Sequence, residues 1–191
     1  MRPLPDFTRR ALQVAPELLG CVLRANGVAA RIVEVEAYEG IDDPASHAYR
    51  GITRRTETMF GPPGHLYVYQ MHGHACCNIV CGPDGTASGV LVRAGEVVEG
   101  IELARERRPA AKEVHLARGP GNLTRTLGIT TADDGAFLLA GGPIQLLPGA
   151  APATIAAGPR VNVAQAADRA WRFYDADSRA VSAFKAHPST R

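Results

Sequence analysis

Two glutamates and several aromatic residues occur close together early in the sequence. Glu34, Glu36 and Tyr38 alternate along one short segment, and His47 follows nine residues after the tyrosine. A second aromatic segment, residues 66–74, reads Leu-Tyr-Val-Tyr-Gln-Met-His-Gly-His. A carboxylate can activate water, and aromatic rings can hold a flat heterocycle. These residue types therefore suit a hydrolase that holds a nucleobase and delivers water to a neighbouring carbon.

Composition limits the classes of protein that fit these residues. The chain has 191 residues, 46% of them hydrophobic, which is enough for one well-packed domain and short for two. We therefore expect a single domain over residues 1–191. The formal net charge is only +2, but Lys112 and Lys185 are the only lysines, so almost all cations are arginines. An arginine-rich surface suits phosphate contacts, although a basic face is often merely solvated.

The cysteines and the apolar segments indicate where the protein works. Cys21, Cys76, Cys77 and Cys81 form no Cys-x-x-Cys pair, which argues against a disulfide framework and for a reducing compartment. No secretory segment can be drawn at the N-terminus, and the longest apolar tract, residues 136–157, is interrupted by glycine and proline. We expect a cytoplasmic protein that does not enter membranes.

The pattern of hydrophobic residues and turn formers predicts a mainly antiparallel sheet with a few helices. Asp6 is expected to cap a helix that runs to about Pro16, and Asn26-Gly27 is expected to join two strands as a tight turn. A second hairpin should have His72-Gly73 near its tip. The complete set of expected strands is 21–24, 28–38, 65–80 as a hairpin, 85–98 as a strand pair, 137–147 and 161–163, with further helices at 99–108 and 121–127.

Alternation along a strand would separate the acids from the apolar residues. Val33, Val35 and Ala37 should share one face, while the two glutamates and Tyr38 share the other and point away from the packed side. An isolated Glu-x-Glu is usually a solvated strand face. Here the neighbouring tyrosine and His47 favour a general base beside rings that exclude water.

Other motifs allow more than one interpretation. His72 is either a polar turn residue or a planar wedge that enters a nucleic-acid groove when a base swings out. His72, His74 and Cys76 could ligate zinc, but the spacing matches no common zinc pattern, and we predict no metal site. The turn that begins at Arg118, Arg-Gly-Pro-Gly-Asn, could bind a phosphate through backbone N–H groups, although such helix starts often bind no ligand.

Taken together, these residues resemble one family, the alkyladenine (3-methyladenine, methylpurine) DNA glycosylases. The similarity follows the family order and covers nearly the whole chain. The matching segments are residues 33–38, 45–48, 63–69, 77–79, 89–94, 119–123 and 171–174. With the element pattern, the resemblance predicts a mixed α+β single domain. It would have a curved, mostly antiparallel, partly open barrel-like sheet, flanking helices and a protruding β-hairpin.

The resemblance also implies a role for each matching residue. Glu36 would activate water, and Arg93 would help to position that water. A flipped purine would lie between Tyr38 on one side and His47 with Tyr69 on the other. The remaining expected residues are Ala45 in the base pocket, Asn78 at the purine edge, His72 as the DNA wedge, and Arg50, Arg54, Arg55 and Arg118 at the DNA backbone. Relatives usually carry tyrosine at the wedge position, so His72 departs from the pattern.

The activity implied is that of a monofunctional DNA glycosylase of base excision repair. Its substrate would be double-stranded DNA with damaged purines of the 3-methyladenine, 7-methylguanine, hypoxanthine and ethenoadenine class. We expect a monomer in the bacterial cytoplasm or nucleoid, with no cofactor and no lyase step, because neither lysine falls in a pocket motif. The alternatives are a non-catalytic binder of damaged or structured nucleic acid and a metal-dependent hydrolase. The presence of both Glu36 and Arg93 favours the enzyme.

Overall fold

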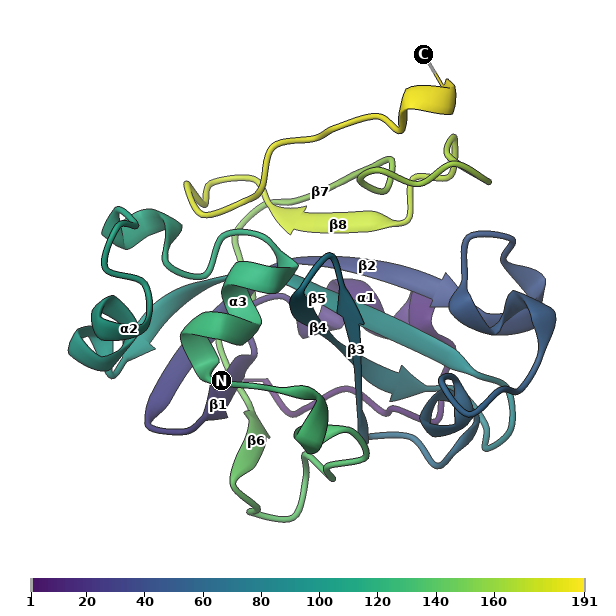
Figure 1. The fold of residues 1–191 in the computed structure, drawn as a ribbon, viewed down its shortest axis with the longest axis horizontal. Coiled ribbons are helices and arrows are strands. Elements are labelled where there is room, and N and C mark those ends of the chain that lie inside the picture. The colour runs from purple at the N-terminus through teal and green to yellow at the C-terminus, as the bar shows by residue number, and fades with distance from the viewer. Residues whose placement is uncertain (1, 191) are drawn as a thin grey trace.

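A computed structural model describes residues 2–190 and contains one eight-stranded sheet. Six strands lie in the order β3-β4-β5-β2-β1-β6, β8 pairs with β2, and β7 pairs with β8, always antiparallel. The strands are β1 (Val22–Ala25), β2 (Val28–Glu39), β3 (Leu66–Met71), β4 (His74–Cys81), β5 (Ser88–Glu99), β6 (Ile144–Leu147), β7 (Ile155–Gly158) and β8 (Arg172–Asp175). The sheet curls into a half-barrel (Figure 1), which confirms the predicted fold class.

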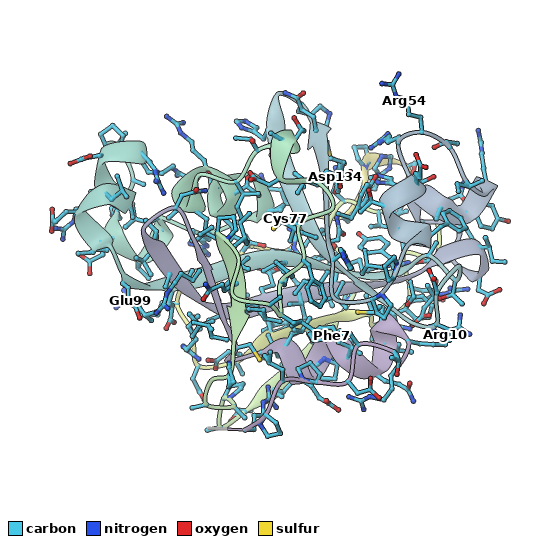
Figure 2. All side chains as sticks on the ribbon, turned by 90° about the horizontal axis from the view of Figure 1, so that it is seen from below. Phe7, Arg10, Arg54, Cys77, Glu99 and Asp134 are labelled. Carbon is cyan, nitrogen blue, oxygen red and sulfur yellow. The ribbon has the colours of Figure 1, made fainter. Side chains whose placement is uncertain are left out.

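Over residues 2–190, the structure contains three α-helices: α1 (Ala11–Leu18), α2 (Ile101–Arg107) and α3 (Pro120–Leu127). Helices α1 and α3 pack against the sheet and add their apolar side chains, among them Val14 and Leu123, to the main hydrophobic core. Phe7 and Cys77 contribute to the same core and lie in the interior of the molecule (Figure 2). Within residues 2–190, the helices are too short or too polar to cross a membrane.

Strand β2 is the central element because it pairs with β1, β5 and β8. Its register against β5 shifts on both sides of Glu34, as in a β-bulge. An extra residue in a strand reverses the faces beyond it. Val35 therefore lies in the main core, whereas Val33 belongs to a small separate cluster with Ala94 and Ala180. The prediction that Val33 and Val35 share one face was wrong for this reason.

The hairpin of β3 and β4 ends in the predicted turn. His72 and Gly73 both have positive φ, 49° and 80°, which is the combination that a two-residue hairpin turn requires. The flanking pair is Met71 opposite His74, and His72 is exposed at the tip. Because the strands continue into the sheet through β4 and β5, the tip has a fixed position relative to the centre of the molecule.

The start of α1 differs from the prediction. Asp6 does not cap the helix; its carboxylate instead accepts hydrogen bonds from the backbone N–H and hydroxyl of Thr8. The helix begins at Ala11, whose N–H donates to the Ser88 side chain, while the next N–H donates to Glu39. The free N–H groups at the helix start thus form hydrogen bonds with residues far away in the sequence. A capping rule that considers only neighbouring residues cannot predict such partners. Pro16 lies inside the helix rather than at its end.

Other expected elements also have different boundaries. Residues 85–98 are not a strand pair, because β5 is one continuous strand between β4 and β2. Of the expected strand 137–147, residues 144–147 form β6 against β1, and Phe137 makes only an isolated bridge to His65. Residues 161–163 form no strand, because the Val161 N–H donates to the Glu36 side chain instead of to a neighbouring strand. The last strands are β7 and β8.

We predict that Gly40→Ala lowers the free energy of unfolding by about 2–4 kcal/mol in urea titrations. Gly40 has a φ of 61°, and an added Cβ would lie 2.4 Å from the Thr86 carbonyl oxygen. The control is Gly135→Ala, where φ is 81° but no atom lies within 4 Å. That substitution should cost only about 1 kcal/mol, from backbone strain. Equal losses in the two variants would show that the close approach to Thr86 is unimportant.

Candidate active site

One cavity of about 580 Å³ gathers most of the residues predicted to be functional. Its size is in the range of sites for small ligands. The lining comes from β2, β3, β4, β5, the hairpin tip, the start of α3, the segment between β2 and β3, and the C-terminal part of the chain. The predicted residues among the lining are Tyr38, Ala45, His47, Tyr69, His72, Asn78 and Arg93, and residues 161–165 and His187 line it as well.

Glu36 lies directly behind this lining and is fully buried. Its Oε1 accepts a hydrogen bond from the Val161 N–H at 2.7 Å. Its Oε2 accepts from the Tyr38 hydroxyl at 2.9 Å and from Nη1 of Arg93 at 3.3 Å. All three donors belong to residues that line the cavity. A carboxylate can accept about four hydrogen bonds, so these three donors orient Glu36 and leave capacity for one more, such as a water.

Arg93 joins Glu36 to a second buried carboxylate, Glu34. The Arg93 Nε donates to Glu34 at 3.0 Å, and Arg172 donates to the same oxygen of Glu34 at 3.3 Å. Ser182 contributes both its N–H and its hydroxyl to Glu34, each at 2.8 Å. Both glutamates do point away from the main core, as predicted, but residues of the C-terminal part of the chain bury them instead of solvent covering them. In Figure 1 this part of the chain, with β7 and β8, lies beside β2.

Tyr38 forms one wall of the cavity and is supported from behind. The guanidinium of Arg160 lies 4.7 Å from the Tyr38 ring centre and 5.0 Å from that of Trp171. Arg160 is buried and donates to both carboxylate oxygens of Asp43 and to the Ala37 carbonyl oxygen. Burial, and then the charge of Glu36, hold the pKa of the Tyr38 hydroxyl well above its usual value. The hydroxyl therefore keeps the proton that it donates to Glu36.

Tyr69 and His47 form a second wall. Their rings meet edge to face, with centres 4.5 Å apart and an angle of 87° between the planes. Burial, and then the charge of Arg55, lower the pKa of His47 to about 4, so the imidazole is neutral at pH 7. Arg55 can only donate, so His47 Nε2 accepts its hydrogen bond at 3.3 Å. The proton of the neutral ring is then on Nδ1, which faces the Tyr67 hydroxyl at 3.4 Å.

Asn78 and His72 complete the predicted set at the cavity. The Asn78 side chain is buried on β4, and its Nδ2 donates to the Tyr67 carbonyl oxygen at 3.3 Å, which fixes the carboxamide against β3. His72 reaches the cavity from the hairpin tip. The positions of Asn78 on its strand and of His72 in its turn follow from the strand and turn pattern of residues 66–81, which the sequence predicts well.

The four arginines expected at a DNA backbone do not form one group. Arg50, Arg54 and Arg55 are exposed on the segment between β2 and β3, and Arg54 extends away from the body of the protein (Figure 2). Arg118 is different because its Nε donates to the Val181 carbonyl oxygen and its Nη1 contacts His115 at 2.8 Å. Its guanidinium is therefore held by the protein itself, which makes it a weaker candidate for a phosphate contact.

Several residues of the site were missed at the level of sequence. They are Asp43, Arg160, Val161, Arg172 and Ser182, which contact Glu34, Glu36 or the Tyr38 wall. Four of the five are more than 100 positions away from the β2 acids. Of these four, only Arg172 lies in a segment that matches the family, residues 171–174, and no role was expected for it. Two buried acids on one strand face could have indicated that buried cations must lie opposite them.

A zinc site at His72, His74 and Cys76 finds no support in the geometry. No three histidine, cysteine or acidic side chains among residues 2–190 are grouped so that they could hold a metal ion. His72 lies in the turn itself, whereas His74 begins the next strand, beside Gly121 of α3. All four cysteines are buried and free.

Comparisons with known proteins identify the family of the chain. A family model described as Methylpurine-DNA glycosylase (MPG) matches residues 5–179. The chain belongs to the methylpurine-DNA glycosylase family. This family membership makes the chain a DNA-repair enzyme that hydrolyses N-glycosyl bonds at alkylation damage.

Several relatives carry the name "Putative 3-methyladenine DNA glycosylase", and three of them show the degree of similarity. The Nocardia farcinica protein is 52% identical over 184 residues, which cover 91% of this chain and 87% of the relative. The Mycolicibacterium fortuitum protein is 51% identical, with coverage of 93% and 95%. The Burkholderia lata protein is 50% identical, with coverage of 94% and 90%. The resemblance of the sequence motifs to this family is thus confirmed over almost the whole chain.

We predict that His47 titrates with a midpoint near pH 4 in an NMR titration, well below its ordinary value of 6.5. Between these values the unfolded chain binds a proton that the folded protein does not bind, so the contribution of His47 to stability is lost as the pH falls. Above pH 6.5 this contribution is complete. The unfolding midpoint of the wild type should therefore fall more between pH 7 and pH 4.5 than that of His47→Gln. Parallel curves for the two proteins would contradict the buried neutral imidazole.

Proposed function

We propose that the chain is a monofunctional DNA glycosylase that flips damaged purines out of duplex DNA and hydrolyses the N-glycosidic bond with a water activated by Glu36. One observation carries this proposal: the Glu36 carboxylate, bonded to Arg93, lies behind an aromatic cavity large enough for a purine. A buried carboxylate at the wall of a base-sized cavity is what hydrolysis at the sugar carbon requires. The product is an abasic site.

The reaction follows from where charge develops. Cleavage of the bond between C1′ and N9 leaves the electron pair on the purine and positive charge on the sugar. Glu36 stabilises this oxocarbenium-like sugar and orients the water whose oxygen attacks C1′. The water proton passes to the carboxylate, and the new C1′–O bond completes the hydrolysis. Arg93 fixes Glu36 and helps to hold the water, since the arginine lines the cavity and contacts the glutamate.

The substrates that we propose are duplexes with 3-methyladenine, 7-methylguanine, hypoxanthine or ethenoadenine. A flat purine can stack on Tyr38 and on the wall of Tyr69 and His47, while Asn78 meets its edge. Damaged bases that pair poorly cost less to extrude, which adds selectivity. We propose that the monomer binds DNA with His72 entering the duplex and with Arg50 and Arg54 on phosphates, whereas the Arg55 guanidinium is held at His47 and the Tyr69 ring. Such phosphate contacts make affinity fall with added salt.

The proposed reaction needs no cofactor and has no strand-cleaving lyase step. A lyase step begins with a Schiff base from an amine. Lys112 lines a different surface pocket, and neither lysine is among the residues that line the main cavity. Borohydride should therefore trap no covalent complex between the protein and lesion-containing DNA.

We predict that Glu36→Gln lowers the single-turnover excision rate by about 10²–10⁴-fold, because an amide cannot take the proton of water. Binding of a hypoxanthine duplex should be largely retained, since size and most hydrogen bonds persist. The assay treats the product with alkali and compares wild type, variant and chelator-treated wild type. Thermal unfolding of the variant controls for misfolding.

Other outcomes of this assay would change the functional conclusion. Binding without cleavage by the wild type would indicate a non-catalytic binder of damaged DNA. Loss of activity with chelator would indicate a metal-dependent hydrolase. Full activity of a folded Glu36→Gln protein would remove Glu36 from the mechanism.

We predict that His72→Ala reduces excision from a fully paired duplex about tenfold, because no side chain then fills the gap left by the flipped base. Excision of the same lesion from single-stranded DNA should change much less. His74→Ala, two residues away on the same exposed hairpin end, is the matched control. If His72→Ala and His74→Ala behave alike on paired DNA, His72 is not the wedge.

A further inference from the structure

Both tyrosine walls of the cavity have an arginine behind them. The Arg160 guanidinium lies 4.7 Å from the Tyr38 ring centre, and the Arg55 guanidinium lies 5.5 Å from the Tyr69 ring centre. The tyrosines line the cavity, whereas neither arginine is among its lining residues. A base that stacks on either ring would therefore have a positive charge beyond the ring.

The charge of Arg160 is neutralised locally, but that of Arg55 is not. Arg160 forms a buried ion pair with Asp43. Arg55 forms no ion pair with an acid among residues 2–190; its guanidinium contacts the neutral His47, the Tyr67 hydroxyl and the Tyr69 ring. Asp134 lines an outer groove together with Arg54, Arg55 and Tyr69. Its carboxylate accepts from the Val68 N–H and the Thr58 hydroxyl and forms no ion pair with Arg55. Arg55 is thus a cation behind the cavity wall that has no ion-pair partner in the described part of the chain.

We propose that Arg55, acting through the Tyr69 wall, favours the excision of neutral damaged purines such as hypoxanthine over cationic ones such as 7-methylguanine. This inference rests on the proposed function, because it requires that a purine leaves from this cavity. Arg55 would be a positioning and electrostatic residue rather than one that touches the reacting atoms.

The direction follows from the charge on the leaving base. When the C1′–N9 bond breaks, its electron pair stays on the purine, so a neutral base becomes negative and a cationic base becomes neutral. A nearby positive charge stabilises the first transition state relative to free substrate. For a cationic base, the positive charge opposes binding of the substrate. This repulsion disappears as the bond breaks, because the leaving base becomes neutral. Arg55 should therefore raise kcat/KM for neutral lesions only. It should raise the single-turnover rate, at which the bound complex reacts, for both kinds of lesion.

The distance is short enough for this effect. A base stacked about 3.5 Å beyond the Tyr69 ring would lie about 9 Å from the guanidinium. Most of that path runs through protein rather than through salt solution, where screening would be stronger. The same charge already acts on this wall, since Arg55 contributes to the lowered pKa of His47.

The test compares Arg55→Met and Arg55→Lys with the wild type on two duplexes that differ only in the lesion, hypoxanthine or 7-methylguanine. Arg55→Met should lower kcat/KM for hypoxanthine about threefold to tenfold more than for 7-methylguanine. Arg55→Lys keeps the charge and should restore most of this ratio. For 7-methylguanine, Arg55→Met should lower the single-turnover rate and the KM together.

Arg54→Met is the matched control. Arg54 is the neighbouring exposed arginine, lines the same outer groove and extends into solvent (Figure 2). Its loss should lower kcat/KM for both lesions by the same factor, as expected for a phosphate contact. If Arg55→Met also lowers both equally, Arg55 is only a backbone contact and the inference is overturned. A change of ratio in Arg54→Met as large as in Arg55→Met would overturn it as well.

A second readout separates this inference from the proposed function. In Arg55→Met, the pKa of His47 measured by NMR should rise from about 4 towards its ordinary value. That measurement needs no excision, so it tests the electrostatic effect even on an inactive protein. An unchanged His47 pKa would overturn the inference. Absence of excision of every lesion by the wild type would overturn the proposed function instead.

Discussion

Arg93 joins two carboxylates that would otherwise repel each other in the interior. Glu34 and Glu36 project from the same face of β2, and both are fully buried. Two buried like charges would cost several kcal/mol without compensation. Arg93 bonds to both, and Arg172 adds a second cation at Glu34, so the group as a whole is neutral. The orientation of Glu36 towards the cavity depends on this group.

The same network connects the end of the chain to the beginning. Ser182 donates to Glu34, and the Val161 N–H donates to Glu36. The C-terminal third therefore shields the acids from bulk solvent and supplies hydrogen bonds to them at the same time. Burial of this kind strengthens the electrostatic interactions on which a single catalytic carboxylate relies. The cover is thus part of the site as well as part of the fold.

The aromatic walls depend on similar support from charged groups. Arg160 holds Tyr38 from behind and is itself fixed by Asp43 and by the Ala37 carbonyl oxygen. A ring fixed in this way loses little freedom when a base stacks on it, which favours binding. The wall of Tyr69 is held by edge-to-face contact with His47, and burial, and then the charge of Arg55, keep that imidazole neutral by lowering its pKa.

The sequence alone determined much of the molecule. Alternation and turn chemistry predicted the hairpin with His72 at its tip and the strand that carries Glu36, because these features depend on neighbouring residues. The motifs were enough to predict the family. Tertiary structure decided the rest. It fixed the start of α1, whose first N–H groups donate to Ser88 and Glu39, placed Val33 on the opposite face from Val35 at the bulge, and buried the β2 acids. Those features arise from hydrogen bonds and ion pairs between residues far apart in the chain, which no local pattern contains.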